Sequence, residues 1–197
     1  MANDVEYALM AGVSYRSTRA DINRFPIPDG WLEVPLSHVT MPSGFEAVSF
    51  QRGNEIVISF AGTAQLVDWL ANIGLATGAG SDQLRDAAAY YLEIRNANPD
   101  AVITFTGHSL GGGLAALMGV LFNEKTVSFD PAPFRSSANN DRRDILLNQL
   151  AGLGYTQGSA IDALRSFTSS MPSTQPSEGG IRGEDGVRAI LVAGEAV

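Results

Sequence analysis

The stretch "VITFTGHSLGGGLAALMG", residues 102–119, decides the fold of this chain. Its first residues are β-branched and apolar, which predicts a strand that is buried on both faces. The run after Ser109 is apolar and rich in glycine and alanine, and it predicts a helix that is buried on most sides. A second strand-like run, "KTVSF" at 125–129, follows soon after. Strand, helix and strand at this spacing form a βαβ unit, so we predict an α/β protein with a mainly parallel sheet.

The segments before this unit have equally clear patterns. The runs "FEAVSFQ" (45–51) and "EIVISF" (55–60) are strand-like and are separated by Arg-Gly-Asn. Because glycine and asparagine accept the positive φ of a tight hairpin, we expect two antiparallel strands here. Residues 3–13 predict a short helix. Residues 81–98 predict a longer amphipathic helix, with Ser81 as its expected N-cap.

The segment 135–186 has a different character. Two short helices are expected at 141–154 and 159–170, and a stretch rich in proline, serine and glycine follows them. Such an insertion between strands is typical of a helical cap or lid, and a plain surface excursion is the alternative. Residues 187–197 predict a further strand. With 45% hydrophobic residues and no internal repeat, residues 1–197 are expected to form a single domain.

Composition excludes several classes of partner. The formal net charge is −8, whereas a surface that follows nucleic-acid phosphates must collect lysine and arginine. The absence of cysteine excludes disulfides and thiolate metal sites, and the scattered acidic residues show no metal-ligand spacing. The N-terminus lacks the basic start and apolar run of a signal peptide, and no uninterrupted apolar run is long enough to span a membrane. We expect no nucleic-acid partner. No metal-ligand residues are assigned and metal use stays open, as does the choice between a cytoplasmic protein and one exported by a C-terminal signal.

The motif "GHSLG" at 107–111 presents Ser109 between the expected strand and helix. This is the context of a nucleophile elbow, in which a strained turn exposes a serine hydroxyl at the edge of the sheet. The helix directs its unpaired N–H groups toward this point, which favours developing negative charge. We expect the N–H of Leu110 to be one donor of an oxyanion hole and Thr63, after the strand at 55–60, to be the other. A structural glycine turn is the alternative for the motif, and a helix cap is the alternative for Thr63.

With these residues identified, two separated pieces of the chain resemble one superfamily. "VISFAGTAQLVDWLANI" (57–73) is similar to the oxyanion turn, and "ITFTGHSLGGGLAAL" (103–117) to the elbow, of the α/β-hydrolase superfamily. The similarity is greatest to class 3 lipases and related bacterial lipases, and it covers about 45–134. One difference is Ala61, where these lipases usually carry arginine.

The resemblance implies an α/β-hydrolase-like fold and the hydrolysis of carboxylic esters, often of acylglycerols or phospholipids. The reaction would use a Ser-Asp-His triad and no organic cofactor. By position, Ser109 would be the nucleophile, and Thr63 and Leu110 would form the oxyanion hole. Asp68 and Trp69 would support the oxyanion loop.

The base of this triad is not evident. The chain has two histidines, His38 and His108, and neither follows the serine, although the superfamily places its histidine after the last strand. His108 is expected to point away from the serine hydroxyl and to serve in packing. His38 lies in an N-terminal loop and stays open as a base, because geometry rather than chain order defines a triad. We expect the base to be encoded beyond Val197.

The acid has two candidates, Asp130 and a residue that follows the final strand, beyond Val197. Asp130, in "VSFDPAPF", occupies the position and the Asp-Pro-Ala setting of the acid in pancreatic-type lipases, whereas class 3 lipases place it one strand later. An N-cap or turn role for Asp130 is the alternative.

The sequence therefore predicts a serine ester hydrolase of lipase or esterase type that acts on an acyl ester or lipid. Its activity is expected to be low, since no histidine follows Ser109. The alternative is a hydrolase-fold module that binds an acyl chain or a protein without catalysis. A thioesterase or peptidase fits less well, because no aminoacyl-recognition feature is visible.

Overall fold

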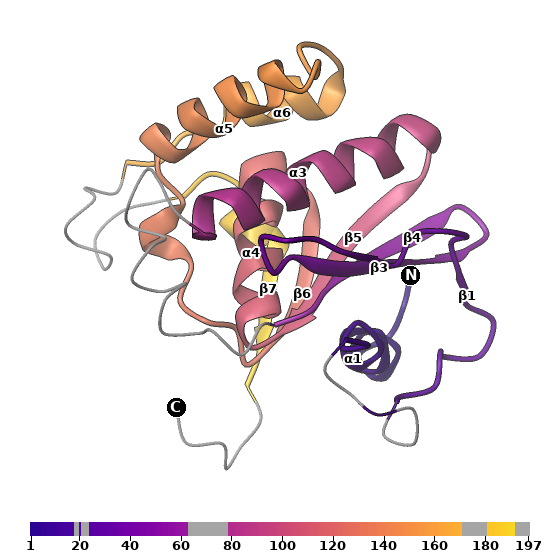
Figure 1. Cartoon of the computed structure of the whole chain (residues 1–197). Helices are drawn as coiled ribbons and strands as arrows, with labels where there is room; N and C mark the ends of the chain where they lie inside the picture. Colours follow the sequence, from indigo (N-terminus) through magenta and orange to yellow (C-terminus); the bar gives the residue numbers. More distant parts are fainter. Residues whose placement is uncertain (18–19, 21–23, 63–78, 171–180, 192–197) are drawn as a thin grey trace.

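A computed structural model describes residues 1–17, 20, 24–62, 79–170 and 181–191. In this part of the chain a seven-stranded sheet runs in the order β1-β3-β4-β5-β6-β7, and β2 also pairs with β3 (Figure 1). The strands are β1 (Leu32–Glu33), β2 (Val39–Thr40), β3 (Glu46–Arg52), β4 (Glu55–Phe60), β5 (Val102–His108), β6 (Lys125–Phe129) and β7 (Val187–Ile190).

The sheet is mixed, and its direction changes at β4. Strands β4 to β7 are parallel to one another, whereas β1, β2 and β4 pair with β3 in the antiparallel sense. The hairpin between β3 and β4 closes at Arg52 and Glu55, and Gly53 at its tip has a φ of 58°. The predicted α/β class, the mainly parallel sheet and this hairpin are confirmed.

Helices cover both faces of the sheet (Figure 1). One face carries α1 (Asp4–Val13), and the other carries α3 (Ala79–Ala97) and α4 (Leu110–Phe122). Outside these, α5 (Asn140–Gly152) packs on α3, and α6 (Ser159–Ser166) packs on α4. Two short 3₁₀ turns, Arg135–Ser137 and Glu184–Gly186, precede α5 and β7.

The helix α1 begins at a capping box. The Asn3 side chain accepts from the Glu6 N–H, and the Glu6 carboxylate accepts from the Asn3 N–H, so two N–H groups of the first turn are satisfied. The face of α1 that meets the sheet is apolar and forms a core of its own. The buried residues of this α1-side core are Tyr7, Met10, Ala11, Val13, Trp31, Val48, Phe50, Val57, Val127 and Phe129.

The main core lies between the sheet and the helices on its other face. It contains the apolar face of α3, namely Leu84, Ala87, Ala88, Tyr91 and Leu92. Ser81 is not the N-cap of this helix: the helix already includes residues 79 and 80, and the Ser81 hydroxyl accepts from Gln149 of α5.

The two helices expected within 135–186 are present as α5 and α6. Their apolar side chains, among them Leu146, Leu150 and Leu164, belong to the main core, so both helices are anchored in the helical layer. Residues 171–180 lie outside the described part of the chain. The lid role of 135–186 and the single-domain boundary 1–197 stay predictions.

The sequence missed two short strands and misjudged the length of two others. Strands β1 and β2 have two residues each, which is too short to produce a periodic pattern, and both are held by their pairing with β3. Strand β5 runs to His108, three residues beyond its apolar part, because its end pairs with Phe129 of β6. The described part of β7 ends at Ile190. Among the described helices, none has both the length and the apolarity that a membrane crossing requires.

Candidate active site

Ser109 occupies the sharp turn between β5 and α4. Its φ of 54° and ψ of −122° are sparsely populated for a residue with a side chain, and such a conformation costs about 1–3 kcal/mol. Two bonds hold the turn: the Ser109 N–H donates to the carbonyl of Phe129 (3.0 Å), and the Ser109 carbonyl accepts from Ala132 (2.9 Å). The Ser109 side chain is partly exposed and does not cap the helix. The predicted nucleophile is therefore presented at the carboxyl edge of the parallel sheet, as an elbow requires.

Glycines around the turn allow this close packing. A Cβ atom at Gly107 would lie 2.5 Å from the Gly111 carbonyl, and one at Gly111 would lie 2.7 Å from the carbonyl carbon of Ala61. On the other side of α4, a Cβ at Gly113 would lie 2.6 Å from the Ala132 carbonyl oxygen. The first turn of α4 is thus wedged between the ends of β4 and β6, and this contact requires residues without side chains.

The expected oxyanion turn, which follows β4, approaches the elbow at Gly62. A Cβ atom built at Gly62 would lie 3.2 Å from the His108 carbonyl oxygen and 3.3 Å from the Gly111 nitrogen. The start of the oxyanion turn therefore touches the elbow. Leu110 is the first residue of α4, so its N–H is one of those without an intrahelical partner. Thr63 lies outside the described residues, so its role stays a prediction.

Asp130 is the first residue after β6 and stands beside the elbow. It has a φ of 42°, and its N–H donates to the Ile190 carbonyl (2.9 Å) of β7. Its carboxylate oxygen Oδ2 lies 4.0 Å from Nε2 of His108, and its side chain is mostly buried. Because β5 and β6 are adjacent parallel strands, the structure brings Asp130 and Ser109 to the same edge; the acid role itself stays a prediction.

His108 directs its ring to the α1 face of the sheet. Its Nδ1 lies 3.5 Å from the hydroxyl of Tyr15, and the two rings meet edge to face. The ring also lines a cavity of about 600 Å³ with Tyr15, Phe129, Asp130 and residues of α1. The walls of this cavity are mainly apolar.

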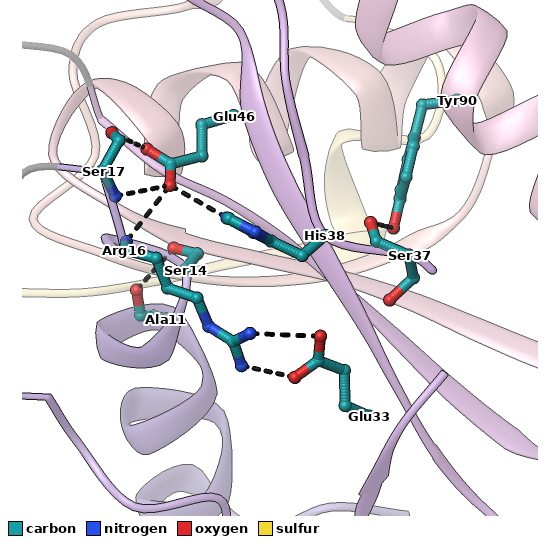
Figure 2. A network of polar contacts seen from close by, with 9 residues as sticks. All are labelled: Ala11, Ser14, Arg16, Ser17, Glu33, Ser37, His38, Glu46 and Tyr90. Atoms are coloured by element: carbon teal, nitrogen blue, oxygen red, sulfur yellow. Dashed lines mark hydrogen bonds and ion pairs between the residues drawn. The ribbon is translucent and has the colours of Figure 1, made fainter. Parts of the chain in front are cut away.

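His38 is held at the start of β3 (Figure 2). Its Nε2 bonds a carboxylate oxygen of Glu46 at 3.0 Å. Glu46 is almost fully buried and also accepts from the backbone N–H groups of Arg16 (3.1 Å) and Ser17 (2.9 Å) and from the Ser17 hydroxyl. The described contacts of His38 therefore join it to Glu46 and not to Ser109.

Two residues near the site carried no signal in the sequence. Tyr15 and Glu46 stand far from the elbow along the chain, and neither belongs to a motif. Only the pairing of strands and the packing of α1 bring them to the carboxyl edge of the sheet. In the part of the chain that the structure describes, no group of three or more histidine, aspartate or glutamate side chains is placed to hold a metal ion.

Comparisons with known proteins assign the chain to a family. Residues 12–165 match the family model described as phospholipase-like, Tle-like phospholipase domain. The "Extracellular phospholipase A1" of Serratia liquefaciens is 39% identical over 98 residues, which are 50% of this chain and 30% of that protein. The chain thus spans less than a third of the length of that relative.

Solved lipase structures also match the chain. Lipase II from Rhizopus niveus covers 74% of this chain, with 66% of its own length, 16% identity and a TM-score of 0.47. The lipase from Rhizopus microsporus var. chinensis covers 64% of this chain, with 56% of its own length, 16% identity and a TM-score of 0.45.

The match to the family model begins near the end of α1 and reaches α6, and it includes β4, the elbow and α5. The matched residues make up most of the chain. The protein therefore belongs to the family of Tle-like phospholipase domains.

Proposed function

We propose that this chain carries the nucleophile and oxyanion machinery of a phospholipid acyl-ester hydrolase. The observation that carries the proposal is the conformation of Ser109: a serine with a φ of 54°, partly exposed, at the junction of a parallel strand and a buried helix. The family match and the similarity to a phospholipase A1 support a phospholipid as the substrate.

The proposed reaction uses the elbow and the turn that begins at Gly62. The Ser109 oxygen attacks the ester carbonyl and loses its proton to a base, and the carbonyl oxygen becomes anionic. The N–H of Leu110, with a donor from Thr63, stabilises that oxygen. When the intermediate collapses, the alcohol leaves as a lysophospholipid and takes up a proton, and the acyl group stays on Ser109. Water then attacks the acyl-enzyme and releases the fatty acid. In this scheme Asp130 is the acid that orients the base.

We expect removal of the proton from Ser109 to limit the rate of hydrolysis. Of the two histidines, His38 is bonded to Glu46 and the ring of His108 lies on the α1 side with Tyr15. Removal of the base from a triad costs on the order of 10⁶ in turnover and leaves ~10³–10⁴ over water from the oxyanion hole and binding. We therefore expect slow chemistry from this chain alone.

A fluorophosphonate probe tests the proposal, because phosphonylation of the serine requires the same attack and the same oxyanion donors. We expect slow, stoichiometric labelling of the peptide that contains Ser109, detected by mass spectrometry. The variant Ser109→Ala should remain unlabelled, and heat-unfolded protein should lose the reaction. A folded chain that takes up no label over a day would contradict the proposal.

The second candidate is a module that binds an acyl chain without catalysis. The mainly apolar cavity of about 600 Å³ beside His108 and Asp130 favours it. In that case a fluorescent fatty acid would bind, Ser109 would stay unlabelled, and Ser109→Ala would not alter binding. Whether the protein is cytoplasmic or exported stays a prediction.

A further inference from the structure

We propose that Tyr15 is a positioning residue that fixes the strained turn of Ser109 and joins it to the oxyanion turn. The inference rests on the proposed function for its catalytic meaning. It rests on geometry alone for its structural meaning.

The hydroxyl of Tyr15 lies where three pieces of backbone meet. It donates to the carbonyl oxygen of His108 at 2.9 Å. A Cβ atom at Gly62 would lie 2.6 Å from the same hydroxyl, which shows that Gly62 and the Tyr15 oxygen are nearly in contact. That Cβ would also lie 3.3 Å from the Gly111 nitrogen. One phenolic oxygen therefore touches both the elbow and the turn that begins the oxyanion loop.

The bond to His108 acts on the peptide plane that enters Ser109. The carbonyl of His108 and the N–H of Ser109 belong to the same planar peptide unit. Tyr15 holds its oxygen, and the carbonyl of Phe129 holds its N–H at 3.0 Å. With both ends fixed, the plane cannot rotate, and the unfavourable φ of Ser109 persists. A strained conformation of this kind survives only where its surroundings determine it more than once.

The residues that follow Tyr15 are held by the Glu46 network, which Figure 2 shows. The two residues after Tyr15, Arg16 and Ser17, direct their backbone N–H groups to the buried Glu46 carboxylate. The guanidinium of Arg16 pairs with Glu33 of β1. Ser14, before Tyr15, donates its hydroxyl to the Ala11 carbonyl of α1 at 2.8 Å. The residues on both sides of Tyr15 are thus bonded to α1 and to the sheet, so the backbone that carries the Tyr15 ring is held in place.

The matched pair of variants is Tyr15→Phe and Tyr90→Phe. Each removes one phenolic oxygen and keeps the ring. The Tyr90 hydroxyl bonds Ser49 (2.6 Å) and the Ser37 carbonyl (2.8 Å), and it lies on the other face of the sheet. Burial raises the pKa of Tyr90 to about 12, so this control hydroxyl stays protonated at any assay pH.

The first measurement is the second-order rate of fluorophosphonate labelling at Ser109. We expect Tyr15→Phe to react about tenfold more slowly than the wild type, since displacements of ~1 Å at a reacting group cost up to ~100-fold. The labelling rate of Tyr90→Phe should stay within about twofold of the wild-type rate, even if this variant loses as much melting temperature as Tyr15→Phe does. Equal rates for Tyr15→Phe and wild type would overturn the proposal.

The second measurement is hydrogen–deuterium exchange, which does not depend on reactivity. We expect faster exchange in peptides that cover residues 106–112 in Tyr15→Phe, and unchanged exchange there in Tyr90→Phe. If the wild type takes no label, the hydrolase proposal fails and exchange alone decides: faster exchange at 106–112 supports the positioning role, and unchanged exchange refutes it.

Discussion

Ser109 shows how single residues set this site. Its backbone is strained, and the strain is maintained by backbone bonds to Phe129 and Ala132 and by glycines that let α4 approach β4. A serine in an ordinary helix start would turn its hydroxyl to the helix N–H groups as a cap. Here the side chain makes no such bond, so the hydroxyl stays available for attack.

Gly111→Ala tests the close approach at residue scale. The added methyl group would overlap the carbonyl oxygen of Phe60 and the carbonyl carbon of Ala61. Because both of these atoms belong to the backbone, neither can rotate away. We expect a loss of about 1–3 kcal/mol in the free energy of unfolding, measured by urea denaturation, and slower labelling of Ser109.

Gly152→Ala is the control for Gly111→Ala. Gly152 lies in the last turn of α5, and a Cβ there has nothing within 4 Å. Since alanine favours the helix over glycine by up to ~1 kcal/mol, this variant should be as stable as the wild type or more stable. A Gly111→Ala protein as stable as Gly152→Ala would show that the packing of α4 against β4 is looser than described.

The helix α1 shows how an element is held in place. Its apolar face packs on the sheet, and ion pairs bind its first turn to strands: Glu6 pairs with Arg52 of β3, and Asp4 pairs with Arg188 of β7. The loop after its last turn is held by Glu46. Since only Ser14 separates Tyr15 from the end of α1, the position of this helix is transmitted to the elbow.

The Asp4–Arg188 pair predicts a pH-dependent stability. The hydrogen bond from Arg188 lowers the pKa of Asp4 below its ordinary value of 3.8. A carboxyl whose pKa is lowered by folding stabilises the protein fully above its unfolded pKa, and the contribution is lost as pH falls through the folded value. We expect Asp4→Asn to lower the free energy of unfolding at pH 7, with a difference that shrinks once the pH drops below 3.8.

The background variant Arg188→Gln is the control for this pair. In that background Asp4→Asn should produce no change that depends on pH across the acidic range. Both side chains are more than half exposed, so the coupling should also decrease as salt is added. A coupling that is the same at pH 7 and at pH 2.5 would contradict the assignment.

At the scale of the whole molecule, one sheet separates two cores. Phe50 and Trp31 lie in the α1-side core, and Phe105 lies in the main core with α3 and α4. Strands β3 and β4 contribute side chains to both cores, because alternate residues of a strand face opposite sides. Loss of either core therefore removes the support of the other.

We expect the two cores to unfold in a single transition. Trp31 reports on the α1 side once Trp69, which lies outside the described residues, is replaced by Phe. Its fluorescence and the far-ultraviolet circular dichroism should give coincident urea curves. Phe50→Ala and Phe105→Ala, one on each side, should each lower the free energy of unfolding by about 3–5 kcal/mol in both signals. Separate transitions for the two probes would show that α1 docks independently.

The sequence by itself determined the elements whose patterns are local. The apolar runs of β4, β5 and β6, the Gly53 hairpin and the amphipathic face of α3 follow from residue order, because burial on one or both faces imposes a period on the chain. The elbow serine followed in the same way, since its glycines and its flanking strand and helix are contiguous in the chain. The resemblance that these motifs carried is confirmed by the family match.

Only the tertiary structure decided which distant residues meet at the elbow. Tyr15 is 93 positions from His108, and Glu46 is 30 from Arg16, so no local pattern predicts either contact. The same holds for the histidines: the structure directs His108 to Tyr15 and His38 to Glu46. These contacts arise because the carboxyl ends of the parallel strands and the start of the antiparallel strand β3 lie at one edge of the sheet, where the residues that follow α1 reach them.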